Sequence, residues 1–177
     1  LHTIIGDIIV GYEDGEPVEI QISRLLLKNK ATIATAESCT GGRLGSLFAT
    51  PPGASNYYKG SVVSYATSSK VDVLKIDKKL IEEHSVVSEE VAMAMAKNVR
   101  EIFKTDYAIS TTGNAGPAKG DSDADIGTVF IGIATPDKVY AKKFTFGNHR
   151  DKVIGKAVNK SIELIREELF QQVKTHP

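Results

Sequence analysis

Residues 31–48 read ATIATAESCTGGRLGSLF, and this stretch predicts a strand, a tight turn and a helix in that order. Residues 31–36 are short and rich in β-branched side chains, as strands are. The small and polar residues 37–42 follow, and Leu44, Leu47 and Phe48 then recur at helical spacing. A strand joined to a helix by a short turn is a basic unit of α/β proteins.

Strand-like and helix-like patterns of apolar residues recur along the rest of the chain. Apolar residues at helical spacing predict helices over 16–30, 67–74, 78–84 and 150–172, and a helix that Ser88 caps and that buries Val91, Met95, Val99 and Ile102. Strands are predicted over 60–66, 106–111, 127–135 and 139–146, the last two as an antiparallel hairpin through Pro136. These elements predict an α/β fold: a three-layer α/β/α sandwich with a mixed central sheet.

Composition limits the classes of function. The 177 residues suit one core, and 22 basic and 22 acidic side chains cancel, which disfavours nucleic acid or an anionic membrane as partner. The lone Cys39 cannot form an internal disulfide, and no apolar run approaches the roughly 20 residues that span a bilayer, so a cytoplasmic location is expected. Residues 3–10 predict a short strand, and residues 1–15 are interpreted as an extension or the remnant of an upstream domain.

Ser38 is the first candidate for chemistry. A hydroxyl between a strand and a helix N-terminus can face a cleft, with free backbone N–H groups beside it to stabilise an oxyanion. The alternative is that Ser38 or Thr40 only caps the helix that begins near Gly41.

Tyr65 and Lys70 follow the next strand and supply a phenol and an amine. A desolvated lysine or a tyrosinate can deprotonate a serine where histidine is absent, and none of the four histidines lies in a recognisable nucleophile–base motif. The alternatives are a solvated helical lysine and an aromatic residue at the core edge.

A third polar segment, Thr111 to Pro117, lies at the end of another strand, and its glycines allow close approach of backbone N–H groups to a ligand. A tight turn explains it equally well. Arg150 can clamp a phosphate or form a surface ion pair. No metal site is expected, because Asp121, Asp123 and Asp125 lack the rest of a calcium-loop pattern and read better as a solvated loop.

Read together, these segments resemble one known family. The runs Ala36 to Gly42, Ser64-Tyr65 with Lys70, Thr112 to Pro117 and Gly127 to Val129 are similar to the C-terminal domain of the CinA family, the nicotinamide-mononucleotide amidohydrolases. The resemblance covers about residues 16–172 and assigns 16–177 to the amidohydrolase domain. It implies hydrolysis of nicotinamide mononucleotide to nicotinic acid mononucleotide and ammonia without a metal or other cofactor, in pyridine-nucleotide salvage.

The resemblance also implies roles for individual residues. Ser38 corresponds to the nucleophile, and Tyr65 and Lys70 correspond to the groups that assist it. The predicted substrate contacts are Glu37, Thr40, Gly41, Gly42, Thr112, Gly113 and Arg150. Two positions depart from the family pattern: Ala118 to Asp121, where relatives often have adjacent glycines, and Ser61, where a glycine or a bulkier residue is usual.

Two other functions remain open. One is a non-catalytic module that binds a nucleotide or docks a partner, as the family's historical link to competence and DNA damage suggests. The other is an amidase that acts on a different small amide. The resemblance and the apolar strand predicted at residues 3–10 favour a homo-oligomer.

Overall fold

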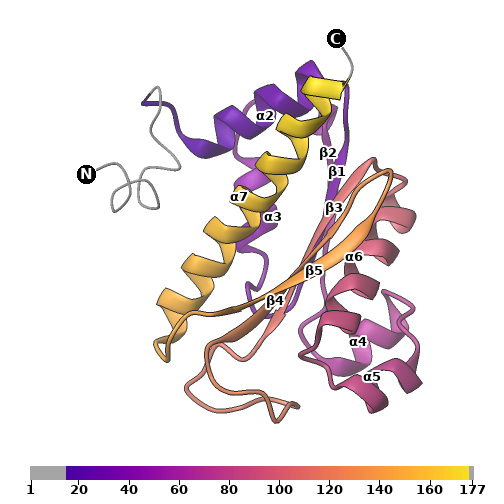
Figure 1. The fold of residues 1–177 in the computed structure, drawn as a ribbon, viewed down its shortest axis with the longest axis vertical. Helices are drawn as coiled ribbons and strands as arrows, with labels where there is room; N and C mark the ends of the chain where they lie inside the picture. Colours follow the sequence, from indigo (N-terminus) through magenta and orange to yellow (C-terminus); the bar gives the residue numbers. More distant parts are fainter. Residues whose placement is uncertain (1–14, 176–177) are drawn as a thin grey trace.

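The central element of the fold is one mixed sheet, seen edge-on in Figure 1. The computed structural model describes residues 15–175. In that part of the chain the strand order is β2-β1-β3-β4-β5, and β1 is parallel to β2 and β3 while β4 is antiparallel to β3 and β5. The strands are β1 (Ile33–Glu37), β2 (Tyr58–Val63), β3 (Tyr107–Gly113), β4 (Thr128–Ala134) and β5 (Val139–Thr145).

Helices cover both faces of this sheet (Figure 1). One face packs against α2 (Val18–Lys28), α3 (Arg43–Ala49) and α7 (Arg150–Thr175), and the other against α6 (Glu89–Phe103), with α4 (Thr67–Asp72) and α5 (Lys78–His84) beside it. A short 3-10 helix, η1 (Ala54–Asn56), precedes β2. The predicted three-layer α/β/α sandwich with a mixed sheet is therefore confirmed.

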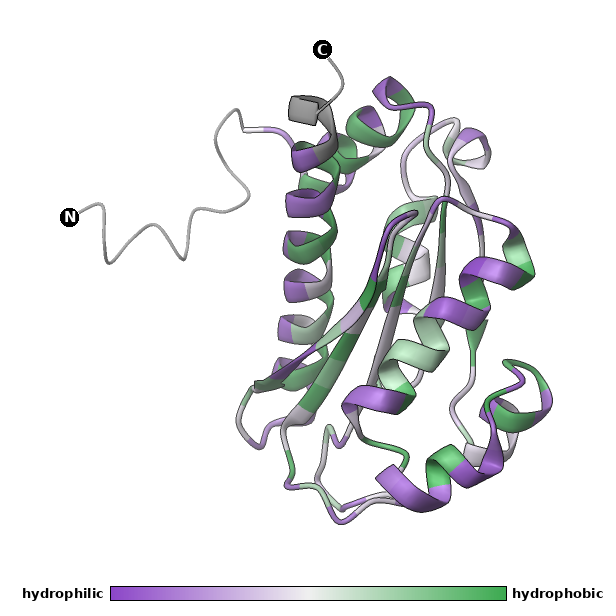
Figure 2. Ribbon diagram, turned by 45° about the vertical axis from the view of Figure 1, so that its right-hand side comes forward, coloured by the Kyte–Doolittle hydropathy of each residue, from purple (hydrophilic) through white to green (hydrophobic). Residues whose placement is uncertain are grey.

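The two faces of the sheet carry side chains of different size. Large residues such as Ile109 and Ile131 pack toward α7, whose apolar side faces the sheet in Figure 2. The α6 face carries Ala34 and Ala108, and a Cβ added at Gly132 would overlap the backbone carbonyl oxygen of Ala92. Small residues on that face therefore allow α6 to approach the sheet closely.

Most predicted elements are present, with shifted ends. Ser88 caps α6 as predicted, because its Oγ accepts the Val91 N–H. The predicted burial of Ile102 is wrong: its side chain is exposed, and the last turn of α6 instead sets Phe103 against Gly60 of β2. β2 ends at Val63, before Tyr65, whereas β3 extends through Thr112 and Gly113. The strand predicted at 3–10 lies outside the described residues.

The parallel strands bring three loops to one edge of the sheet. Glu37 at the end of β1 is in register with Val63 of β2 and Thr111 of β3, so the loops after these strands begin side by side. In open α/β sheets, ligands bind beyond the carboxyl ends of parallel strands. No helix in residues 15–175 is long and apolar enough to cross a bilayer.

Candidate active site

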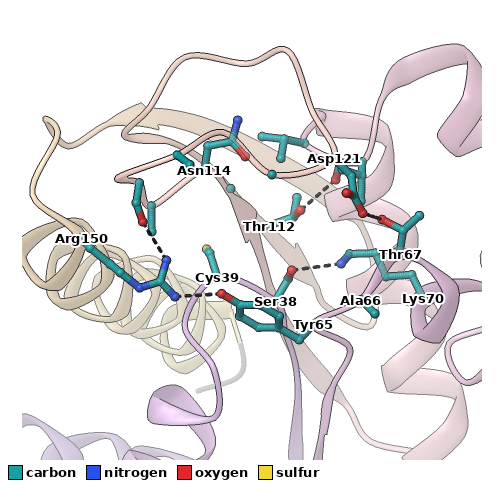
Figure 3. A pocket seen from close by; sticks show the side chains of 17 residues that line it. Ser38, Cys39, Tyr65, Ala66, Thr67, Lys70, Thr112, Asn114, Asp121 and Arg150 are labelled. Carbon is teal, nitrogen blue, oxygen red and sulfur yellow. Dashed lines mark hydrogen bonds between the residues drawn. The ribbon is translucent and has the colours of Figure 1, made fainter.

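A cavity of about 260 Å³ lies where these three loops meet (Figure 3). The residues that line it come from the turn after β1, the segment that leads from β2 into α4, the segment before α6, the loop after β3 and the start of α7. They are Ser38, Cys39, Tyr65, Ala66, Thr67, Lys70, Val86, Val87, Thr112, Gly113, Asn114, Ala115, Gly116, Ala118, Gly120, Asp121 and Arg150. Six of the predicted site residues therefore share one cavity: Ser38, Tyr65, Lys70, Thr112, Gly113 and Arg150.

Ser38 and Lys70 are in direct contact. The Lys70 Nζ donates a hydrogen bond to the Ser38 Oγ at 3.0 Å and a second one to the Ser64 carbonyl at 2.8 Å. Both side chains are buried, and Lys70 is only 1% exposed. Lys70 is therefore not a solvated surface lysine but an amine positioned to remove the Ser38 proton.

The environment of Lys70 favours the neutral amine. Burial lowers the pKa of Lys70 to about 8, because the charged ammonium loses solvation in this cavity. Electrostatic interactions with Cys39 and, less strongly, with Asp121 act in the opposite direction and are too weak to offset burial. A lysine with a pKa of about 8 is a competent general base near neutral pH.

Cys39 follows Ser38 and lines the same cavity, but its thiol is poorly suited to attack. Burial raises the pKa of the Cys39 thiol to about 12, so the thiol stays protonated. Because the thiolate is the reactive form of cysteine, Ser38 is the better nucleophile of the two.

The turn that carries Ser38 is held by Glu37, whose side chain is fully buried. One carboxylate oxygen accepts the Gly42 and Leu44 N–H groups and the Thr40 hydroxyl. The other accepts the Gly45 N–H at 2.6 Å and, more distantly, the Ser61 hydroxyl. Glu37 therefore caps α3, a role for which the sequence pattern favours Ser38 or Thr40.

Four predicted substrate contacts do not line the cavity: Glu37, Thr40, Gly41 and Gly42. Thr40 is buried between Glu37 and Thr111, with hydroxyl distances of 2.6 and 2.7 Å. The Gly41 N–H donates to the Ser38 carbonyl and the Gly42 N–H to Glu37. These two N–H groups are thus already bonded within the turn, and this arrangement disfavours them as donors to an oxyanion.

Tyr65 and Arg150 form one side of the cavity (Figure 3). Arg150, the first residue of α7, donates to the Tyr65 hydroxyl at 2.8 Å and to the Gly116 carbonyl at 2.9 Å. The Tyr65 side chain is exposed, so it is not an aromatic residue of the core edge. The guanidinium thus joins the loop after β2 to the loop after β3.

The loop after β3 forms the remaining wall. The Thr112 hydroxyl donates to the Val86 carbonyl at 2.8 Å, and the Asn114 amide donates to the Ala124 carbonyl at 2.7 Å. Thr67 and Asp121 also line the cavity, although neither was predicted as a site residue, and the Thr67 hydroxyl donates a 2.8 Å hydrogen bond to the Asp121 carboxylate. In the sequence they belong to a polar helix start and a polar loop, which carry no motif. Residues 15–175 contain no group of three or more His, Cys, Asp or Glu side chains arranged to hold a metal ion.

Comparisons with known proteins agree on one family. Residues 15–169 match the family described as CinA C-terminal domain. A CinA-like protein of Flavobacterium psychrophilum is 53% identical over 97% of this chain and 41% of its own length, and one of Salinibacter ruber is 44% identical over 82% of this chain and 35% of its own. The chain thus spans about two fifths of the length of these relatives.

Two solved structures show the same fold. The competence damage-inducible protein A of Klebsiella pneumoniae superposes with a TM-score of 0.82 at 28% identity, covering 86% of this chain and 94% of that one. A competence-damaged protein (CinA) superfamily protein of Escherichia coli gives a TM-score of 0.80 at 28% identity, covering 84% and 86%.

Proposed function

This chain belongs to the family defined by the CinA C-terminal domain, and on that premise we propose that it hydrolyses the carboxamide of nicotinamide mononucleotide. The products are nicotinic acid mononucleotide and ammonia. The observation that carries the proposal is the 3.0 Å contact between the Ser38 hydroxyl and a buried Lys70 amine. A serine with a neutral lysine beside it is a known solution for acyl transfer without histidine.

The reaction has two halves. In the first, neutral Lys70 takes the Ser38 proton while the Ser38 Oγ bonds to the carboxamide carbon. The resulting tetrahedral intermediate collapses and the C–N bond breaks. The Lys70 ammonium gives its proton to the amide nitrogen, which leaves as ammonia. In the second, Lys70 takes a proton from water, the hydroxide attacks the acyl-enzyme, and Ser38 regains its proton as the acid leaves.

The geometry favours Lys70 over Tyr65 as the immediate base. Lys70 contacts the Ser38 hydroxyl directly, whereas the Tyr65 hydroxyl accepts a hydrogen bond from Arg150. A phenol that faces a guanidinium is suited to orienting the substrate and to donating a hydrogen bond to its oxygen atoms. We therefore assign Tyr65 to substrate positioning.

The cavity walls suit an aromatic nucleotide. Val86, Val87 and Ala115 line the cavity and supply apolar surface for a flat ring. Arg150 supplies a planar set of donors for a phosphate. The cavity volume of about 260 Å³ lies slightly below the usual range of small-molecule sites, about 300–1,000 Å³.

Ammonia release from a panel of amides tests the proposal. The purified chain should release ammonia from nicotinamide mononucleotide and little from free nicotinamide or glutamine. Ser38→Ala should lower turnover by about 10³-fold or more, because nucleophile and base fail as a unit. Ser46→Ala is the matched control, since Ser46 is an exposed serine of α3 outside the cavity. Normal turnover by Ser38→Ala would refute the assignment.

A second candidate function is a non-catalytic nucleotide-binding or partner-docking module. It is favoured by the description of the Klebsiella pneumoniae neighbour as a competence damage-inducible protein. Calorimetry separates the two candidates: binding of nicotinamide mononucleotide with no ammonia released over hours would support the module.

A further inference from the structure

Asp121 occupies a cavity position that the proposed reaction leaves without a role. It belongs to the long loop between β3 and β4, and its Oδ2 accepts a hydrogen bond from the Thr67 hydroxyl at 2.8 Å (Figure 3). Thr67 is the first residue of α4, and Lys70 lies one turn later in the same helix. The carboxylate is thus attached to the element that presents the base to Ser38.

The charges around Lys70 make this carboxylate distinctive. The turn after β1 contributes the Ser38 hydroxyl and the protonated Cys39 thiol, and the segment after β2 contributes the Ser64 carbonyl. Across the cavity, the Arg150 guanidinium donates a hydrogen bond to the Tyr65 hydroxyl. Among the side chains that line the cavity in the described part of the chain, Asp121 is the one carboxylate.

A carboxylate at this place matters at one moment of the reaction. When Lys70 accepts the Ser38 proton, a positive charge forms at a buried nitrogen that has little contact with water. Burial opposes that charge, and a nearby anion stabilises it. The cost of creating the ammonium therefore depends on whether position 121 is negative.

We propose that Asp121 is a positioning residue for Lys70: held by Thr67, its carboxylate stabilises the ammonium that Lys70 becomes when it deprotonates Ser38. The inference rests on the proposed amidohydrolase function. It assigns a role to a loop position where this chain departs from the glycine-rich pattern expected of its family. Asp121 is an exposed residue, so solvent screens its charge and its effect is moderate.

Two substitutions separate the charge from the hydrogen bond. Asp121→Asn removes the charge, and its amide oxygen can still accept the Thr67 hydroxyl. Thr67→Val removes the hydrogen bond and leaves the charge. Asp123→Asn is the matched control, because Asp123 lies two residues further in the same loop and does not line this cavity.

The first readout is the dependence of kcat/KM on pH with nicotinamide mononucleotide. Because the anion raises the pKa of Lys70, its loss in Asp121→Asn should move the acid limb to lower pH. At pH values above that limb, kcat/KM should fall by about two- to fivefold, since a weaker base accepts the proton less readily. Thr67→Val leaves the charge but frees the carboxylate, so it should move the limb in the same direction by a smaller amount, and Asp123→Asn should match the unsubstituted chain.

The second readout needs no turnover. The titration of the Lys70 side chain, followed by NMR in protein labelled with ¹³C at lysine Cε, should have a lower midpoint in Asp121→Asn than in the unsubstituted chain. An unmoved midpoint, or an equal movement in Thr67→Val and Asp123→Asn, overturns the inference. Absence of ammonia release by the unsubstituted chain instead overturns the proposed function, and the NMR titration still decides whether the charge acts on Lys70.

Discussion

The Lys70 Nζ lies 3.0 Å from the Ser38 Oγ, and the Lys70 side chain is 1% exposed. A lysine in such a place has an unfavourable energy when charged, because it has exchanged water for one hydroxyl and one carbonyl. The fold tolerates this cost, and the result is an amine that is partly neutral near pH 7. The first two predictions follow from this relationship.

The activity should depend on pH through Lys70. Since the neutral amine is the base and its pKa is about 8, kcat/KM should rise as pH increases through about 8. At pH 7 about one tenth of the molecules should carry neutral Lys70. Ammonia release measured between pH 6 and 9.5 checks this, and a rate that is flat across that range would contradict the role of Lys70 as base.

Lys70→Met should abolish activity and stabilise the fold at neutral pH. The folded-state pKa of about 8 lies below the ordinary value of 10.5, so the folded chain binds fewer protons than the unfolded chain between these values. The stability of the unsubstituted chain therefore increases with pH across this window. At pH 7, burial of the charged lysine lowers the free energy of unfolding by about 3 kcal/mol. The hydrogen bonds of Lys70 offset about 1–2 kcal/mol of this cost.

Urea unfolding at pH 7 and pH 10 measures this effect. Lys70→Met should be about 1–2 kcal/mol more stable than the unsubstituted chain at pH 7, and the advantage should shrink at pH 10. Lys97→Met is the control, because Lys97 is an exposed lysine of α6. A loss of stability in Lys70→Met at pH 7 would show that the hydrogen bonds outweigh desolvation.

Glu37→Gln should destabilise the chain and impair catalysis together. The two carboxylate oxygens accept bonds from Gly42, Leu44 and Gly45 N–H groups, so an amide NH₂ at this place must face at least one other donor. We expect the free energy of unfolding to fall by about 2–4 kcal/mol, as it does when other buried charged networks lose a partner. Thermal or urea unfolding measures it.

The control for this substitution is Glu89→Gln, on an exposed glutamate in the first turn of α6. That change should alter stability by about 0.5 kcal/mol or less. Equal stabilities of the two variants would mean that Glu37 does not hold the turn that presents Ser38.

Arg150→Ala should weaken recognition of the phosphate. Its guanidinium faces the cavity and is bonded to Tyr65 and Gly116, so its loss removes both a charge and a link between two loops. We expect KM for nicotinamide mononucleotide to rise by about 10- to 100-fold, the range for losing a charge-assisted contact. For the corresponding nucleoside, which lacks the phosphate, the same substitution should change KM much less.

Arg43→Ala provides the comparison for Arg150→Ala. Arg43 pairs with Asp151 near the start of α7 but does not line the cavity, and its ion pair is exposed. Its KM should stay close to that of the unsubstituted chain. If Arg150→Ala raised KM equally for the nucleotide and the nucleoside, the phosphate would have to bind elsewhere.

Much of the architecture could be predicted from local patterns. The β-branched run at 31–36, the helical stripe of α7 and the Ser88 cap were interpreted correctly, because each depends on residues within a few positions of one another. Ile102 shows the limit of that reasoning. It has the right spacing for the core, and the tertiary structure sets Phe103 against β2 instead.

Local patterns were enough to predict the layers of the fold and to single out Ser38, Tyr65 and Lys70, since strand and helix periodicity and family motifs are local properties of the chain. The packing of distant segments was needed to see that Lys70 is buried against Ser38, that Glu37 caps α3 without facing the cavity, and that Asp121 contacts Thr67 from 54 residues away. The reason is physical: desolvation, hydrogen-bond partners and nearby charges depend on which distant segments pack together, and no local pattern encodes them.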